Sequence, residues 1–248
     1  MNAIIIIPAR FASSRLPGKM LSELGGRPVI WHTWQKALAC GAAQVLVATD
    51  HEAIAEVIRD GGGEALMTGS GCRNGAERVA HACRMLGLPQ DAIVVNLQGD
   101  EPGMPPEAIA AAVAALEEES DCAMSTLAVP LLDEEEARDP HVVKVVCNAR
   151  GRAMYFSRSL IPASHDGKPW PRMRHVGLYA YRVSALLHLS SLPPAPIEEA
   201  ESLEQLRALW HGMAIAVAMA PAPIIRGIDT PEDLERWRAM LQNQPPCP

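Results

Sequence analysis

Short apolar runs alternate with amphipathic stretches along the first half of the chain. The run Ile4–Ile7 stops at Pro8, and a second run, Val45–Ala48, follows an amphipathic stretch that opens at Pro28 and ends near Gly41. Continuous β-branched runs are typical of parallel strands buried on both faces, and a helical stretch between two such runs indicates a crossover. The pattern therefore predicts an α/β fold with a mostly parallel central sheet and helices on both faces.

The same alternation continues to the middle of the chain. Helices are predicted at Ala53–Arg59, Ala76–Leu86 and Pro105–Glu118, and strands at Glu64–Met67 and Ile93–Leu97. Each strand is followed by a helix of roughly one crossover length, as expected of a parallel sheet.

From residue 123 onward the pattern changes to closely spaced strands. These are predicted at Met124–Pro130, Val142–Cys147, Ala153–Phe156 and His175–Tyr181, and a loop at Pro162–Pro171 interrupts them. Helices at Ile197–Trp210 and Pro231–Leu241, with a strand at Met213–Met219, complete the prediction. No linker or repeat divides the chain, so we expect a single domain over residues 1–248, with an inserted mixed or antiparallel section at about 123–195.

Composition excludes several classes of protein. Hydrophobic residues make up 48% and charged residues 21%, which is ordinary for a globular chain. The formal net charge of -7 argues against nucleic acid or an anionic membrane as the main partner. The start lacks the features of a signal peptide and no long apolar run is present, so we expect a cytoplasmic protein. The six cysteines form no CxxC pair and indicate neither a zinc site nor a disulfide framework.

A cluster of cations follows the first predicted strand. Arg10, Arg15 and Lys19 lie within ten residues, in a segment that also holds Pro17 and Gly18. Ligands of open α/β sheets bind beyond the carboxyl ends of such strands, and two guanidinium groups suit a polyanion such as a nucleoside triphosphate. A solvated basic loop is the alternative.

Carboxylates follow another predicted strand. Asp100 lies in the segment Gln98–Pro102, after the strand Ile93–Leu97. Magnesium is typically held by one or two carboxylates together with substrate phosphates, and Asp229 is the best second candidate. Asp229 precedes Thr230 and Pro231, however, so it also suits an ordinary helix N-terminus. A basic loop facing a carboxylate favours metal-assisted attack on a phosphate.

These residues belong to a longer set of ordered motifs that resembles the 3-deoxy-manno-octulosonate (Kdo) cytidylyltransferases, or CMP-Kdo synthetases. The resemblance covers nearly the whole chain. Its motifs are Ile6–Arg10 with Arg15–Lys19, Val47–Asp50, Gln98–Pro102, Tyr155–Arg158, Arg174–Tyr179, Ser202–Arg207 and Asp229–Leu234.

The resemblance implies transfer of CMP from CTP to Kdo, with release of pyrophosphate, on a Rossmann-like sheet in a magnesium-dependent homodimer that serves bacterial surface polysaccharide synthesis. It assigns Arg10 and Lys19 to the triphosphate, with Arg15 as a helper, and Asp100 and Asp229 to magnesium. Arg10, Lys19 and Asp100 are thus the expected catalytic residues. The expected nucleotide contacts also include Ala9, Asn74 and Gly75, and the expected sugar contacts are Gln98, Arg158, His175, Tyr179, Glu204 and Gln205.

Several of the sugar-side residues have structural alternatives. Arg158 suits either a sugar carboxylate or the cap of a turn. His175 within a strand is typical of a hydrogen-bonded core histidine, whereas Tyr179, four residues further on, shares its strand face and favours a common pocket. Glu204 and Gln205 also suit an ordinary surface turn.

One segment departs from the family pattern. Cys72–Arg78 stands where the family usually has His, then Ser-Gly-Thr, an acid and Arg. The resemblance implies that this loop helps to enclose the nucleotide. Asn74 still offers an amide, whereas Ala76 has no hydrogen-bonding side chain. A cytidylyltransferase for another acid, of the 8-amino-Kdo or sialic-acid type, and a non-catalytic nucleotide-binding paralogue are therefore alternative functions.

Overall fold

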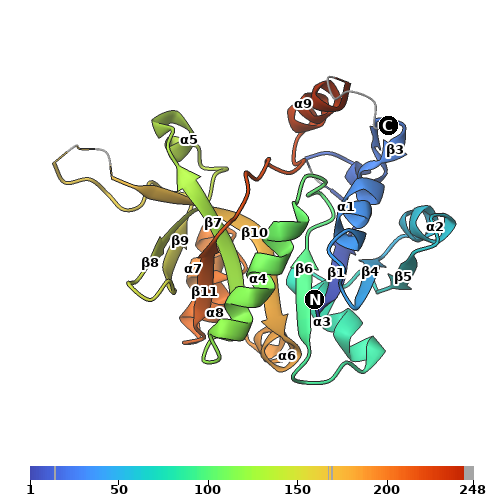
Figure 1. The fold of residues 1–248 in the computed structure, drawn as a ribbon, viewed down its shortest axis with the longest axis horizontal. Helices are drawn as coiled ribbons and strands as arrows, with labels where there is room; N and C mark the ends of the chain where they lie inside the picture. The colour runs from blue at the N-terminus through green and yellow to red at the C-terminus, as the bar shows by residue number, and fades with distance from the viewer. Residues whose placement is uncertain (14, 167, 169, 243–248) are drawn as a thin grey trace. The chain divides into compact units, whose positions relative to one another are not determined.

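A computed structural model describes residues 1–242 of the chain except 14, 167 and 169 (Figure 1). The chain forms two compact units. The first consists of Met1–Gly87, Asn96–Pro106 and the segment that begins at Ile225, and the second consists of Leu88–Val95 and Glu107–Ile224. The predicted inserted section at 123–195 lies within the second unit, which is larger than that section.

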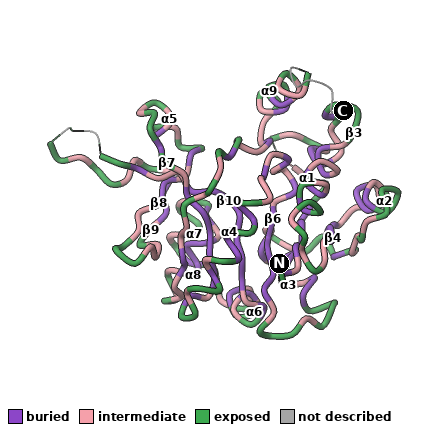
Figure 2. The backbone as a smooth tube through the Cα atoms, in the orientation of Figure 1, coloured by how far each residue is buried: buried purple, intermediate pink, exposed green. Residues whose placement is uncertain are grey.

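The first unit is built on parallel strands. β1 (Ile4–Ala9) pairs in parallel with β4 (Gln44–Thr49), which pairs in parallel with β5 (Glu64–Met67). On the other side of β1 lies β6 (Ile93–Leu97), of which the last two residues belong to the first unit. Residues 5–9 of β1 and all of β6 are buried (Figure 2). The apolar runs thus form inner strands, as predicted.

Three crossover helices connect these strands. They are α1 (Val29–Leu38), α2 (Glu52–Asp60) and α3 (Gly75–Leu86). The chain moves outward from β1 to β4 and β5 and then returns through α3 to β6, so right-handed crossovers place α3 on the face opposite α1 and α2. The strand order reverses between β1 and β6, and ligands of open α/β sheets bind at such a switch point.

Smaller elements complete the first unit. The one-turn helix η1 (Lys19–Leu21) and the hairpin of β2 (Glu23–Leu24) and β3 (Arg27–Pro28) were not predicted, whereas α9 (Pro231–Gln242) was. α9 is fixed by an apolar cluster of Leu24, Val29, Ile228, Leu234 and Trp237.

The second unit contains a mixed sheet. β7 (Met124–Leu131) pairs antiparallel with β10 (Arg172–Arg182) and in parallel with β11 (Ile215–Met219); β8 (Lys144–Cys147) pairs antiparallel with β10 and with β9 (Ala153–Ser157). The predicted mixed section is therefore confirmed. β10 begins three residues before the predicted start at His175 because Arg172 and Met173 pair with Leu131 and Pro130.

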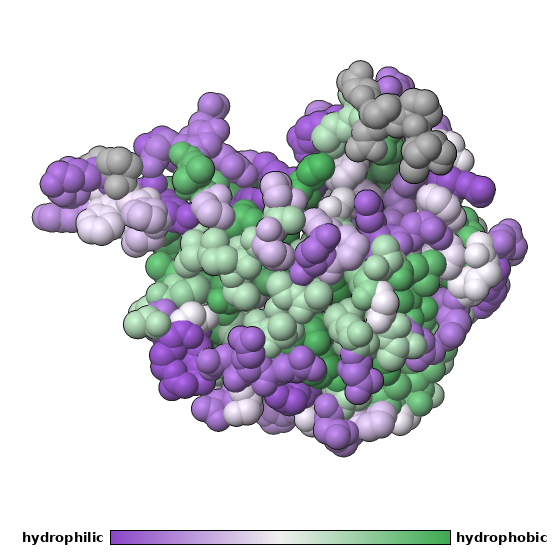
Figure 3. Space-filling view, viewed as in Figure 1, coloured by the Kyte–Doolittle hydropathy of each residue, from purple (hydrophilic) through white to green (hydrophobic). Residues whose placement is uncertain are grey.

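The helices of the second unit are α4 (Pro106–Glu118), α5 (Glu134–Arg138), α6 (Val183–Ser191), α7 (Pro196–Glu201) and α8 (Leu206–Trp210). α4 packs on β7, where Ser125 Oγ donates to Ala112 O at 2.5 Å. Its outer face, which includes the exposed Ala110 and Ala114, forms a pale apolar area in Figure 3. Among the described residues, no helix is long and apolar enough to cross a membrane.

The prediction of one helix over Ile197–Trp210 is wrong. Ser202 takes the left-handed conformation (φ 51°), and the segment divides into α7 and α8. Leu203 N donates to Glu198 O and Ser202 N donates to Glu199 O, which is the hydrogen-bond pattern of a Schellman motif. The usual signal for this helix end is glycine, and serine stands in its place. α5 and α6 were not predicted.

Candidate active site

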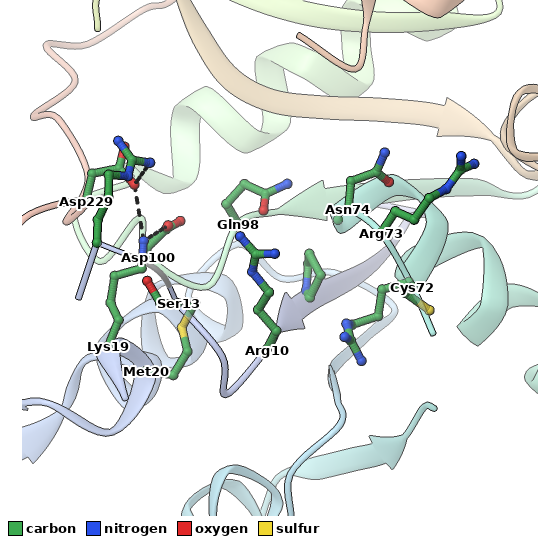
Figure 4. Close-up of a pocket in the computed structure, with 14 residues that line it drawn as sticks. Arg10, Ser13, Lys19, Met20, Cys72, Arg73, Asn74, Gln98, Asp100 and Asp229 are labelled. Atoms are coloured by element: carbon green, nitrogen blue, oxygen red, sulfur yellow. Dashed lines mark hydrogen bonds and ion pairs between the residues drawn. The ribbon is translucent and has the colours of Figure 1, made fainter. Parts of the chain in front are cut away.

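A pocket of about 250 Å³ lies in the first unit, beyond the ends of β1 and β6 (Figure 4). The two strands end together, since Gly99 N donates to Pro8 O at 3.3 Å. The lining residues are Pro8, Arg10, Ser13, Arg15, Lys19, Met20, Cys72, Arg73, Asn74, Gly75, Arg78, Gln98, Asp100 and Asp229. In Figure 4, Lys19, Asp100 and Asp229 gather at one end and Cys72 and Asn74 lie at the other.

A buried lysine joins the two predicted metal-binding carboxylates. Lys19 Nζ donates to Asp100 Oδ2 and, at 3.2 Å, to Asp229 Oδ1, while Arg15 Nη2 contacts the same Asp229 oxygen at 2.8 Å. Burial alone would lower the pKa of Lys19, but the charges and hydrogen bonds of Asp100 and Asp229 outweigh it and raise the pKa. Lys19 is therefore a fixed positive charge at neutral pH.

Close backbone packing brings the two carboxylates together. Ile228 N donates to Asp100 O at 2.9 Å. A Cβ atom on Gly227 would lie 2.7 Å from that same carbonyl oxygen and 2.8 Å from the carboxylate of Glu101. Only glycine allows the segment before Asp229 to approach Asp100 this closely.

The helix start beside Asp229 does not use its side chain. Thr230 Oγ1 accepts from Asp233 N at 3.3 Å, and Asp233 Oδ2 accepts from the backbone nitrogens of Asp229 and Thr230 at 2.9 and 3.0 Å. Burial opposes ionisation of Asp233, but these two donors and Arg236 lower its pKa. Because Thr230 and Asp233 cap α9, the carboxylate of Asp229 reaches Lys19 instead.

The segment that differs from the family pattern, Cys72–Arg78, forms the other end of the pocket. Asn74 is the N-cap of α3, and its Oδ1 accepts from Glu77 N at 2.9 Å. A Cβ on Gly75 would lie 2.7 Å from Nε2 of Gln98, so the absence of a side chain at Gly75 makes room for Gln98. Gln98 Nε2 in turn donates to Asn96 Oδ1 at 3.1 Å.

The structure thus groups eight of the predicted residues in one pocket: Arg10, Arg15, Lys19, Asn74, Gly75, Gln98, Asp100 and Asp229. Ala9 is fully buried within β1 and does not line it. Arg78 lines the pocket without having been assigned a role. The sequence feature that could have identified Arg78 is the set of glycine, acidic residue and arginine that the segment Cys72–Arg78 shares with the family pattern.

The remaining predicted residues lie in the second unit. Arg158 Nε donates to Glu201 O at 2.7 Å and its Nη1 donates to Pro140 O at 2.9 Å, so the guanidinium holds the turn after α7. Glu204 and Gln205 lie between α7 and α8. Gln205 is 3% exposed, and its buried Nε2 has no hydrogen-bond partner among the described residues.

His175 and Tyr179 are neighbours in β10, as their spacing predicts. Their ring centroids are 5.5 Å apart, and two extra residues between Val176 and Tyr179 leave both side chains on one face. His175 Nε2 lies 3.0 Å from Thr126 Oγ1, and burial, followed by the charge of Arg174, lowers the pKa of His175 to about 3. Burial, and then the charge of Glu204, raises the pKa of Tyr179. Both side chains are therefore neutral at neutral pH.

Comparison with known proteins identifies the family of this chain. The sequence model of the cytidylyltransferase family matches residues 4–215. The 3-deoxy-manno-octulosonate cytidylyltransferase of Halorhodospira halophila is 46% identical over 96% of both chains, and that of Yersinia enterocolitica is 43% identical over 98% of this chain and all of its own. The chain belongs to the 3-deoxy-manno-octulosonate cytidylyltransferase family. It is a nucleotidyltransferase, and the predicted family is confirmed.

Solved structures agree with this family membership. A CMP:2-keto-3-deoxy-manno-octonic acid synthetase complexed with CTP superposes with a TM-score of 0.90 at 39% identity, over 98% of this cytidylyltransferase and 99% of that chain. The 4-diphosphocytidyl-2C-methyl-D-erythritol synthase of Anaerococcus prevotii reaches a TM-score of 0.62 at 17% identity, over 98% and 99% of the two chains, and shares the fold.

Proposed function

We propose that this protein transfers CMP from CTP to Kdo and releases pyrophosphate. The observation that carries the proposal is the pocket at the end of β1, where Arg10, Lys19 and Asp100 meet at the switch point of the sheet. The similar synthetase solved with CTP supports CTP as the nucleotide, and the names of the relatives support Kdo as the acceptor.

In this reaction the hydroxyl oxygen of the sugar acid forms a bond to the α-phosphorus and loses its proton to water, and the bond between that phosphorus and the bridging oxygen of pyrophosphate breaks. Negative charge grows on the departing pyrophosphate. Arg10 and Lys19 hold the triphosphate and stabilise that charge, with Arg15 as a third cation. Binding of an anion by Lys19 weakens its contact with Asp100 and Asp229.

Asp100 and Asp229 are suited to Mg²⁺. The ammonium group of Lys19 already lies between their oxygens, so this position accepts a positive charge. Within the described residues no group of three or more His, Cys, Asp or Glu side chains is arranged for a metal, and Mg²⁺ typically needs only one or two carboxylates beside substrate phosphates. When bound, the ion supplies charge that neutralises the phosphates and makes the attacking hydroxyl more acidic.

The family resemblance assigns the sugar acid to Arg158, His175, Tyr179, Glu204 and Gln205, which lie within the second unit, and it also assigns Gln98 of the first unit. The planar guanidinium of Arg158 binds the carboxylate of the sugar acid after it releases the backbone carbonyls that it contacts in this structure. His175 and Tyr179 are neutral and offer hydrogen bonds rather than charge, and Glu204 and Gln205 complete the set. The family also favours a cytoplasmic homodimer that serves lipopolysaccharide synthesis.

The test is pyrophosphate release by the purified protein with Mg²⁺, each of the four nucleoside triphosphates, and Kdo, 8-amino-Kdo or sialic acid. Turnover with CTP and Kdo alone is the expected result. Turnover with another acid and not with Kdo would contradict the proposed acceptor. Binding of CTP without turnover in any pair would favour a non-catalytic paralogue.

A further inference from the structure

Asp50 does not line the pocket, but it contacts Arg78, which does, and Phe11, which follows the pocket-lining Arg10. It follows β4 at the same edge of the sheet, and its side chain is 14% exposed. Oδ1 accepts from Phe11 N at 3.0 Å, and Oδ2 accepts from Arg78 Nη2 at 2.8 Å. Each oxygen of one carboxylate thus holds a different segment of the chain.

On one side Asp50 fixes a pocket-lining cation. The side chain of Arg78 is 3% exposed, and Nη1 donates to Thr68 Oγ1 at 2.7 Å and more weakly to Gly69 O at 3.4 Å. Thr68 is itself held, since its Oγ1 and its N both donate to Thr49 O. Asp50 is the counter-ion in this arrangement, and it sets the direction of the guanidinium.

On the other side Asp50 fixes the loop that carries Arg10. Its bond to the backbone of Phe11 is reinforced by the Phe11 ring, which stacks on His51 with centroids 3.9 Å apart and planes 13° apart. His51 is itself held as the N-cap of α2, because its Nδ1 accepts from Ala53 N at 3.2 Å. The residue after Arg10 is therefore fixed through both its backbone and its side chain.

We propose that Asp50 is a positioning residue, which joins the loop of Arg10 to the helix of Arg78 and so sets the spacing of two cations that bind the nucleotide. Two guanidinium groups that line the same pocket repel each other, and a carboxylate hydrogen-bonded to both segments offsets that repulsion. This inference rests on the proposed function, because it takes CTP as the ligand of the pocket.

The experiment compares Asp50→Ala and Asp50→Asn with the wild-type protein in steady-state turnover and in calorimetric binding of CTP alone. Glu52→Gln is the matched control, since it removes a nearby carboxylate whose partner is the exposed Arg59. Asp50→Ala is expected to raise the KM and Kd for CTP by about tenfold, with kcat changed by less than about threefold and the KM for Kdo unchanged. Asp50→Asn, which retains one acceptor, gives a smaller rise, and Glu52→Gln gives none.

A merely structural role gives a different result. If Asp50 only stabilises the fold, its replacement lowers the fraction of protein that is active. The apparent kcat then falls while the KM for CTP stays at the wild-type value, and this outcome would overturn the proposal. If Asp50→Ala does not fold, Asp50→Asn decides, and a wild-type KM and Kd for CTP in that variant would overturn it. A wild-type protein that binds no CTP would overturn the proposed function together with this inference, whereas wild-type binding with unaffected Asp50 variants overturns this inference alone.

Discussion

At the scale of single residues, the site consists of charges that the fold holds in place before any ligand binds. Lys19 is 7% exposed, and its ammonium lies between Asp100 and Asp229. The sequence identified all three because strand ends are visible as the points where apolar runs stop. It placed Asp50 and Arg78 in family motifs but assigned neither a role, because the contacts of both residues join segments far apart in the chain.

Asp100→Ala is expected to reduce turnover by at least about 10²-fold, because it removes a carboxylate that would hold Mg²⁺ beside the reacting phosphate. The affinity for CTP measured without metal is expected to fall by far less, since the carboxylate of Asp100 is an anion and repels the negatively charged triphosphate. Steady-state kinetics and calorimetry measure the two effects, with Asp60→Ala, a change at an exposed carboxylate of α2, as the control. Near-normal turnover in the Asp100 variant would refute the metal assignment.

His175 gives a prediction on stability. Its pKa in the fold is about 3, whereas an unfolded histidine titrates near 6.5, so the unfolded state binds more protons between these values. The contribution of neutral His175 is complete above about pH 6.5 and falls by up to about 1.4 kcal/mol per pH unit as the pH drops toward 3.

His175→Gln lacks this titration and retains a hydrogen-bonding group near Thr126. Urea unfolding between about pH 4.5 and 7 is therefore expected to show a shallower loss of stability for the variant than for the wild-type protein. Parallel curves for the two proteins would show that His175 is solvated in the fold.

At the scale of elements, periodicity predicted the strands and crossover helices well and the short elements poorly. β1, β4 and β6 are continuous apolar runs, and burial on both faces leaves such runs little freedom. α5 has only five residues, although Asp133 caps it by accepting from Glu135 N and three glutamates follow. Ser202 ends α7 without the glycine that usually marks such an end, so the break has no signal in the sequence.

Gly227→Ala tests how the segment before α9 is held. The new Cβ would lie 2.7 Å from Asp100 O, so the backbone must shift and Asp229 moves away from Asp100. Activity is expected to fall by about tenfold or more, while the α9 cluster around Trp237 keeps the unit folded.

Gly26→Ala is a control for the loss of glycine freedom. Its φ is +82°, yet a Cβ added there would meet no atom of the described residues within 4 Å. An active Gly227→Ala protein would show that the segment tolerates the shift, and the two carboxylates would then not need this spacing.

At the scale of the whole molecule, the chain contains two compact units, with the predicted phosphate-binding residues in the first and most of the predicted sugar-binding residues in the second. The sequence could predict neither the boundary within β6 nor the return of the segment from Ile225 to the first unit, since both arise from long-range packing. If the family's homodimer holds here, light scattering coupled to gel filtration gives a mass of twice 26.7 kDa. A mass equal to the single chain at assay concentration would contradict the dimer.

Product analysis tests the proposed transfer of CMP from CTP to Kdo at the pocket at the end of β1. Mass spectrometry of a mixture of purified protein, CTP, Kdo and Mg²⁺, with Lys19→Met as the inactive control, measures this directly. CMP-Kdo and pyrophosphate are expected in equal amounts with the wild-type protein, and neither product is expected with the variant. CTP and Kdo that remain unchanged beside a folded, CTP-bound wild-type protein would contradict the proposed reaction.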